Sequence, residues 1–387
     1  MSCIERSLSR ILCAAISVLQ ADMRQPWAQA IRAEAEAIAD DREALRFAVE
    51  AFLGMLPSSI ARLLIPPPLQ SDCHSSDAAI GGDPSGPFRP KTLVIGCAAA
   101  GTILGASTLL LSGAPIHYAM INVAALAIGL AIWAMWRLVG WHNSGLVLSS
   151  ALLAGLLLLS FAFGTTAAGA TRWFALGPIQ IQPSLMFLPP LIVLFAKSRS
   201  KLVGLAMTGA LLMIAAQPDR AMSAVALVGV LCVALREPGA FPLGVLGVLG
   251  VAALGFAYTM LTPDRLPATP FVDGVLRGDF ADGPLILMVV WVSAGLLLVP
   301  AIVGWVRHAN ARLAYSVFGA IWSAVILSAV LGNYPSPAAG YGGSAIVGYI
   351  LSGAALSQRG SRKRQANAES MDKSFGFDES EMRRVAA

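Results

Sequence analysis

Charged side chains are scarce in this sequence. Asp, Glu, Lys and Arg make up 13% of its 387 residues, about half the share of an ordinary soluble domain. The apolar residues Ala, Val, Ile, Leu, Met, Phe, Trp, Tyr and Cys make up 56%. This composition excludes an ordinary water-soluble globular protein and favours a membrane protein.

Metal-binding and disulfide patterns are also missing from the sequence. The five cysteines and four histidines lack the close spacing that zinc sites or disulfide frameworks need. Cys97 and Cys232 lie inside apolar runs, where a free thiol acts as a small packing residue. We therefore predict no metal site.

Long apolar runs recur between Lys91 and Leu356. A helix that crosses a hydrocarbon layer of about 30 Å needs about 20 apolar residues, and helical hydrogen bonds satisfy its backbone there. The sequence therefore predicts an all-α polytopic membrane domain over residues 91–357. Its ten transmembrane helices are expected at 92–112, 118–136, 144–163, 183–197, 202–216, 220–235, 241–261, 284–306, 313–331 and 343–357.

The basic residues are distributed unevenly between alternate loops, which predicts the orientation. If residues 1–91 are cytoplasmic, the outer side holds only Arg172, Arg220, Arg265 and Arg277, and the other 23 of the 27 Lys and Arg residues lie inside. Cytoplasmic loops are known to carry such an excess of positive charge. Both termini are therefore expected in the cytoplasm (N-in, C-in).

The first 65 residues are less apolar than the rest and are predicted to be a cytoplasmic helical extension. The apolar stretch Ile11–Leu19 follows a basic start and predicts an amphipathic helix at the membrane interface. Between Trp27 and Met55, apolar residues recur at helical spacing, which predicts a small helical hairpin.

Two further segments flank the membrane domain. Residues 66–90 contain three consecutive prolines with several glycines and serines, which predicts a flexible linker. Residues 358–387 form a cytoplasmic basic tail, and its four basic residues at 359–364 favour contact with anionic lipid head groups over nucleic acid.

Three polar motifs fall on the predicted outer side of the membrane. Gly169-Ala170-Thr171-Arg172-Trp173, with Gln182-Pro183-Ser184, precedes the fourth helix; Gln217-Pro218-Asp219 ends the fifth; Tyr341-Gly342-Gly343-Ser344 opens the tenth. An arginine beside a tryptophan suits a phosphate next to a sugar, because guanidinium pairs with phosphate oxygens. Glycines before a helix leave backbone N–H groups free to meet an anion.

Each motif also has a simpler interpretation. Arg172 and Trp173 are typical of an anchor at the membrane surface. Asp219 is alternatively a solvated carboxylate or the ion-pair partner of the adjacent Arg220. A Gly-Gly-Ser sequence is most often a turn.

Together and in this order, the motifs resemble those of the SEDS family of bacterial polytopic membrane proteins (FtsW, RodA and SpoVE), over residues 91–357. Members of that family handle lipid-linked peptidoglycan precursor at the outer face of the cytoplasmic membrane. The resemblance implies substrate-binding roles for Arg172, Trp173, Gln182, Ser184, Gln217, Asp219, Gly342, Gly343 and Ser344.

The sequence departs from the family pattern at two places. Leu185 and Leu188 occupy positions where the family has Glu and Lys. The loop after the seventh helix is shortened to residues 262–283 and lacks the family's Asp-Pro, whose aspartate is regarded as catalytic. Four aspartates remain in this loop. Asp264 is the first candidate for a catalytic carboxylate and Asp273 the second, ahead of Asp279 and Asp282.

The resemblance implies a peptidoglycan glycosyltransferase of the bacterial cytoplasmic membrane. Its substrate would be undecaprenyl-pyrophosphate disaccharide-peptide (lipid II), with membrane lipids and a transpeptidase of the penicillin-binding class as partners. No cofactor is predicted; a divalent cation is compatible with the chemistry, but no motif specifies one. One alternative is a non-catalytic homologue that binds the precursor lipid or a division or elongation partner. The other is a flippase for the lipid-linked precursor, suggested only by the short fourth helix, which Pro189 and Pro190 are expected to break.

Overall fold

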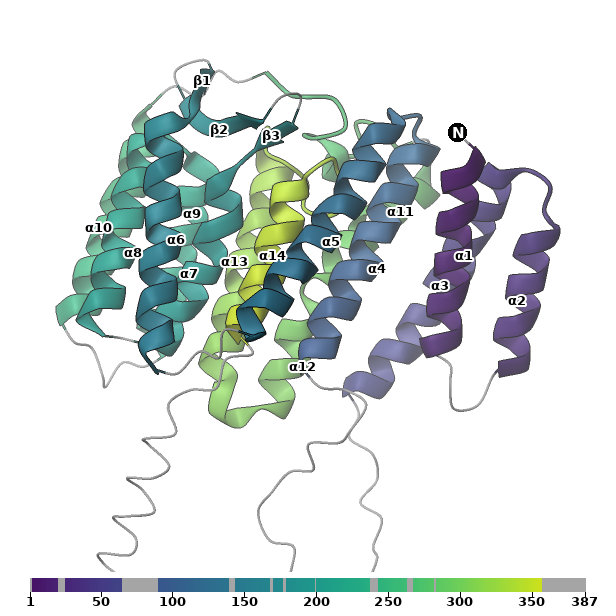
Figure 1. The fold of residues 1–387 in the computed structure, drawn as a ribbon, viewed down its shortest axis with the longest axis horizontal. Helices are drawn as coiled ribbons and strands as arrows, with labels where there is room; N and C mark the ends of the chain where they lie inside the picture. The colour runs from purple at the N-terminus through teal and green to yellow at the C-terminus, as the bar shows by residue number, and fades with distance from the viewer. Residues whose placement is uncertain are drawn as a thin grey trace, which may run out of the picture.

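A computed structural model describes residues 2–19, 25–64, 90–138, 143–167, 170–176, 179–198, 200–236, 243–262, 267–281 and 283–356. The described chain is all-α apart from one small sheet (Figure 1). The α-helices are α1 (Ser2–Leu19), α2 (Gln25–Ala37), α3 (Asp41–Leu64), α4 (Pro90–Leu111), α5 (Ile116–Leu138), α6 (Asn143–Phe163), α7 (Pro183–Lys197), α8 (Lys201–Ala216), α9 (Arg220–Arg236), α10 (Leu243–Leu261), α11 (Pro284–Leu296), α12 (Val299–Arg307), α13 (Arg312–Leu331) and α14 (Gly343–Leu356).

The ten predicted apolar runs are all helical, so the all-α polytopic fold is confirmed. Within the described residues, six helices are long and apolar enough to cross a membrane, while α7, α8 and α14 are shorter apolar helices. The exact number of spans stays a prediction. The run predicted at 284–306 forms two helices, α11 and α12, which meet at Leu297 and Leu298.

The two ends of the membrane domain lie at the same end of the bundle. The start of α4 and the end of α14 both lie at the end opposite the sheet (Figure 1). An even number of membrane crossings between these two ends would place them on the same side of the membrane, which the predicted N-in, C-in orientation requires. The side of the membrane on which each end lies stays a prediction.

The centre of the bundle is formed by α7, which packs against α6, α9, α13 and α14. Leu185 and Leu188, which replace the family's charged pair, are buried there among apolar side chains. The expectation that Pro189 and Pro190 break the helix is wrong, because both lie inside one continuous α7. The sequence feature that suggested a flippase is therefore missing from the structure.

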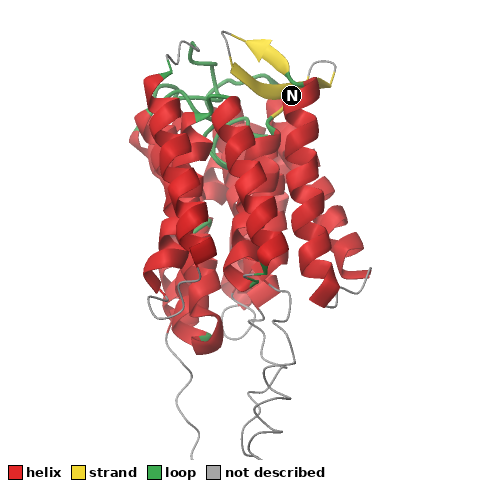
Figure 2. Ribbon diagram, turned by 90° about the vertical axis from the view of Figure 1, so that its left-hand side faces the viewer, coloured by secondary structure: helices red, strands yellow, loops and turns green. Residues whose placement is uncertain are grey.

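The polar connection before α7 folds as a three-stranded antiparallel sheet. Its strands are β1 (Thr165–Ala167), β2 (Ala170–Leu176) and β3 (Ile179–Ile181), in the order β1-β2-β3. The sheet covers one end of the bundle (Figure 2). It carries Arg172 and Trp173 on its central strand and leads through Gln182 directly into α7.

The N-terminal helices are present as expected, but they pack on the side of the bundle. α1 and α3 lie along one another, α2 contacts both, and α3 also contacts α4 and α12 (Figure 1). Arg42, near the start of α3, donates a hydrogen bond to the carbonyl oxygen of Leu111 at the end of α4, so the two helices are antiparallel. Met55 and Leu56 join Leu296 in one buried apolar cluster, which explains this lateral contact. The cytoplasmic location of the extension stays a prediction.

Candidate functional site

The three polar motifs meet at the end of the bundle under the sheet. Asp219 is fully buried; its Oδ2 accepts hydrogen bonds from Gln182 Nε2 at 3.1 Å and from Ser184 Oγ at 3.0 Å. The backbone N–H of Gln182 donates to Ser344 Oγ at 2.9 Å. The start of α7, the start of α9 and the start of α14 are therefore joined by side chains from all three motifs.

Asp219 has a structural role as well. Its Oδ1 accepts from the backbone N–H of Met222 at 3.1 Å, which is the geometry of an N-cap on α9. The predicted alternative of an ion pair with Arg220 does not occur: Arg220 donates to backbone carbonyls at the end of α10, including that of Thr259 at 2.9 Å. Asp219 thus organises the buried cluster.

Arg172 reaches from the sheet into this cluster. Its Nη2 donates to the carbonyl oxygen of Pro218 at 2.5 Å, beside Asp219 in the chain. Its guanidinium carbon lies 5.8 Å from the centre of the Tyr334 ring. Only 4% of Arg172 is exposed, whereas a surface anchor would extend its charged end into the head groups. Trp173 next to it is half-buried.

Two buried amide side chains of the cluster, those of Gln182 and Gln217, can form hydrogen bonds with a ligand. Gln182 is 4% exposed, and its Oε1 accepts no hydrogen bond from the described residues. A buried polar atom without a partner is costly, so it calls for a water molecule, a bound group or a functional role at that place. Gln217, from the same motif as Asp219, is also buried.

The segment 332–344 connects this cluster to the loop that follows α10. The N–H of Ser336 donates to the carbonyl of Val272 at 3.0 Å, and that of Tyr341 donates to the carbonyl of Phe271 at 2.8 Å. Arg277 Nη1 donates to the carbonyl of Gly332 at 2.9 Å. The shortened loop is thus held against the Tyr-Gly-Gly-Ser motif.

Asn122 on α5 is a site residue that the sequence analysis missed. It is fully buried; its Nδ2 donates to the carbonyl of Gly340 at 2.9 Å, and its Oδ1 accepts from the N–H of Gly342 at 3.2 Å. Asn122 therefore holds the turn that presents Gly343 and Ser344 at the start of α14. A lone amide inside an apolar run was the available signal, because such residues in membrane helices usually have a specific role.

The described aspartates of the shortened loop differ in their surroundings. Asp273 is 6% exposed, and its Oδ2 accepts from the N–H of Thr269 at 2.8 Å. Burial raises the pKa of Asp273, while the Thr269 hydrogen bond and the charge of Arg277 oppose that rise. Asp279 is exposed and pairs with Arg277 at 3.1 Å. Asp264 and Asp282 lie outside the described residues.

Several hydrogen-bond donors at this end of the bundle could meet an anion. In the part of the chain that the structure describes, no group of three His, Cys, Asp or Glu side chains is placed to hold a metal. The guanidinium of Arg172, the N–H groups at the start of α14 and the hydroxyl of Ser344 are donors. Asp273, a carboxyl group with a raised pKa, lies in the adjoining loop.

The fold and this site define a polytopic α-helical membrane protein with a buried polar cluster at one end of its bundle. Among solved structures, the chain is similar to the rod shape determining protein RodA of Thermus thermophilus. The identity is 22% over 68% of this chain in both RodA structures. For an Asp-to-Ala variant of RodA, the match covers 95% of that chain with a TM-score of 0.49. For the unsubstituted protein, it covers 94% of that chain with a TM-score of 0.45.

A third similar structure is described as the "structural coordination of polymerization and crosslinking by a peptidoglycan synthase complex". It is 22% identical over 68% of this chain and 95% of the other chain, with a TM-score of 0.47. No protein-family model and no curated protein sequence matches the chain. RodA is one of the members named for the SEDS family, which the polar motifs resemble.

Proposed function

We propose that this chain is a divergent SEDS-type protein of the bacterial cytoplasmic membrane that acts in peptidoglycan synthesis. The observation that carries the proposal is the meeting of the three motifs through Asp219, Gln182, Ser184 and Ser344. These residues are up to 162 positions apart in sequence. Their assembly at one end of the bundle supports a shared ligand over three unrelated turns.

The proposed ligand is a polyprenyl-pyrophosphate-linked saccharide such as lipid II. Arg172 would pair with a pyrophosphate oxygen, because guanidinium donors match phosphate oxygens. Gly343 and Ser344, at the start of α14, would add backbone and hydroxyl donors next to the favourable end of the helix dipole. Gly342, whose N–H donates to Asn122, would shape the turn that presents them. Trp173 and Gln182 would contact the adjoining sugar.

The proposed reaction is glycosyl transfer between two such lipids. A carboxylate takes the proton from a sugar hydroxyl of the acceptor as that oxygen attacks the anomeric carbon of the donor. The bond from that carbon to the pyrophosphate oxygen breaks, and Arg172 stabilises the departing negative charge. Asp273 suits the base among the described aspartates, since a raised pKa brings a carboxylate closer to the pH at which it accepts protons well. Asp264 stays the candidate from the sequence.

A specific observation favours a non-catalytic homologue as the second candidate. The described carboxylates near the site are already engaged: Asp219 accepts three hydrogen bonds, Asp273 binds the N–H of Thr269, and Asp279 pairs with Arg277. Such a protein would bind the precursor lipid and regulate a partner. A transpeptidase of the penicillin-binding class is the proposed partner in either case.

Polymerisation of purified lipid II by the reconstituted protein separates the two candidates. If the protein is a polymerase and Asp273 is its base, Asp273→Asn should lower the rate by roughly 10²–10⁴-fold, while the matched control Asp279→Asn should change it little. If Asp264 is the base, Asp264→Asn should have the large effect instead. Lipid II binding without polymerisation, alone or with a transpeptidase, would establish the non-catalytic homologue.

A further inference from the structure

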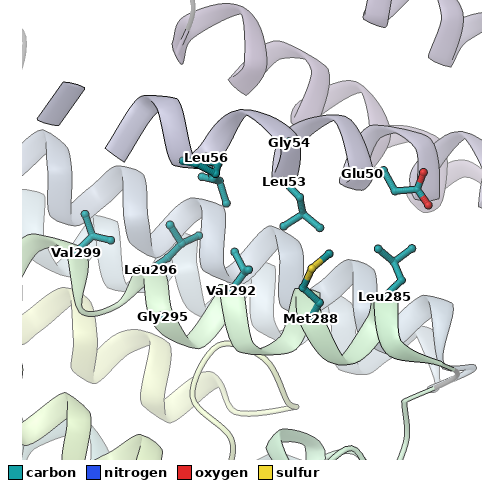
Figure 3. Close-up of a pocket in the computed structure, with 11 residues that line it drawn as sticks. Glu50, Leu53, Gly54, Leu56, Leu285, Met288, Val292, Gly295, Leu296 and Val299 are labelled. Atoms are coloured by element: carbon teal, nitrogen blue, oxygen red, sulfur yellow. The ribbon is translucent and has the colours of Figure 1, made fainter. Parts of the chain in front are cut away.

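An apolar groove separates the N-terminal extension from the membrane helices. It has a volume of about 700 Å³ and lies between α3 and α11 (Figure 3). Leu53 and Gly54 line it from α3, and Met288, Val292 and Gly295 line it from α11. The groove does not include any residue of the polar cluster, so it is a separate feature of the molecule.

Two glycines, one on each wall, leave space open at the groove. An added Cβ at Gly54 or at Gly295 would meet no atom within 4 Å. α3 contacts α4 and α12, which hold the extension beside α11 while the groove between α3 and α11 stays open. Met288, at the middle of the groove wall, is 49% exposed.

The position of the groove selects a lipid chain as its occupant. One wall belongs to the segment Pro284–Arg307, which is long and apolar enough to cross a membrane. The lining runs from Leu285 to Val299, which corresponds to roughly 20 Å along a helix at 1.5 Å per residue. Water has no polar partners along such a wall, whereas a hydrocarbon chain would bury its surface there.

The charge at one end of the groove selects the head group. Glu50 is the charged residue among those that line the groove, and it lies near Leu285, at the start of α11 (Figure 3). Its Oε1 is 3.2 Å from Nε of Arg46, one helical turn earlier. An ammonium group is attracted to Glu50 and a phosphate to Arg46, whereas a pyrophosphate beside Glu50 would be repelled.

We infer that this groove binds one acyl chain of a phosphatidylethanolamine-type phospholipid, with the ammonium group at Glu50 and the phosphate at Arg46. The bound lipid fills the space between the extension and the bundle and so fixes α3 against α11. This places α3 beside the hydrocarbon layer and not in the cytoplasm, where the sequence predicts it. The inference does not depend on the proposed function.

Photo-crosslinking tests the inference on the full chain reconstituted in bilayers of phosphatidylethanolamine and phosphatidylglycerol. The probe is phosphatidylethanolamine with a diazirine in one acyl chain, and the adducts are located by mass spectrometry. We expect adducts on α3 near Leu53 and on α11 near Met288. Filling the groove with Gly54→Leu or Gly295→Leu should lower the yield of the adducts on α3 and on α11 by at least threefold. Gly250→Leu, at an equally open position on α10, should leave them unchanged.

The head group is tested with the same probe on phosphatidylglycerol. Wild-type protein should give fewer groove adducts with this lipid, and Glu50→Gln should reduce the difference between the two head groups. Equal labelling of the groove in the filled variants and the control, or labelling of α11 without α3, would overturn the inference. Displacement of the probe by undecaprenyl pyrophosphate but not by unlabelled phosphatidylethanolamine would also overturn it. Thermal melting shows which variants are folded; since either filled variant alone suffices, one unfolded variant does not prevent the test.

Discussion

Asp219→Asn is the substitution whose effect follows most directly from the buried cluster. The change keeps the size of the side chain and keeps an oxygen that can cap α9 at Met222. It places an amide N–H₂ where Oδ2 now accepts from Gln182 and Ser184. Ser184 can turn its hydroxyl to accept, and Gln182 can turn its amide so that Oε1, which has no partner among the described residues, accepts; both hydrogen bonds then lose the charge of the carboxylate.

The expected loss follows from the hydrogen bond to a charged group. Such bonds contribute about 1.5–3 kcal/mol each, and leaving a buried donor unsatisfied costs about 1–3 kcal/mol. Neutral hydrogen bonds contribute about 0.5–1.5 kcal/mol each, so replacing two charged bonds by neutral ones should make unfolding easier by about 2–3 kcal/mol. This lowers Tm by roughly 4–12 °C on the scale of domains of about 150–250 residues. The combination Gln182→Glu with Asp219→Asn restores a donor–acceptor pair and should recover part of the loss.

A thermal melt followed with a thiol-reactive fluorogenic dye measures this difference, because Cys13 and Cys97 are buried in the folded protein. Asp279→Asn serves as the control: its exposed ion pair with Arg277 contributes at most about 1 kcal/mol. A Tm for Asp219→Asn within 1 °C of the control would refute the assigned hydrogen bonds. A double variant no more stable than Asp219→Asn would refute the pairing with Gln182.

Three further predictions concern the site and the orientation. Asn122→Leu should lower Tm and weaken precursor binding, whereas Asn122→Asp, which keeps the acceptor for Gly342, should lose less of both. Burial raises the pKa of Asp273 above its ordinary value of 3.8, so the folded state holds this proton more tightly than the unfolded state does. The contribution of Asp273 to stability therefore falls as the pH rises from its unfolded pKa through its folded pKa. Asp273→Asn should gain stability relative to wild type as the pH is raised above the ordinary value, in melts followed by tryptophan fluorescence, and the opposite trend would contradict the cause assigned. A cysteine placed at Ala168 should react with a membrane-impermeant thiol reagent added outside and one at Ser198 should not; the reverse pattern would contradict the orientation.

The membrane domain was predictable because long apolar runs, which indicate membrane-spanning helices, are repeated along the chain. Apolar runs can satisfy their backbone groups in a hydrocarbon layer only as helices, so composition alone determined their secondary structure. The break between α11 and α12 was not predictable, because Leu297 and Leu298 are as apolar as the residues around them. The sheet at 165–181 was missed because its strands β1 and β3 have three residues each, too few to show an alternating pattern.

Long-range contacts explain the remaining differences between the predicted site and the site in the structure. The motif residues Gln182, Asp219 and Ser344 were identified from the sequence, but their hydrogen bonds to one another depend on how three helices assemble. Asn122 acts on Gly340 and Gly342, about 220 positions away, and no local pattern records such a contact. The sequence left two interpretations of Arg172 open, a phosphate contact and a surface anchor, and its burial beside the carbonyl of Pro218, 46 positions away, could not be seen in a local pattern.

The central claim, that the cluster under the sheet binds a lipid-linked pyrophosphate, is tested most directly by the Kd for lipid II in nanodiscs. Wild-type protein should bind saturably, and Arg172→Ala should weaken binding by roughly 10–150-fold, the equivalent of one charge-assisted hydrogen bond. Arg172→Lys keeps the charge without the forked geometry and should fall between them. If folded Arg172→Ala binds lipid II as tightly as wild type, or if wild type shows no saturable binding, the claim is contradicted.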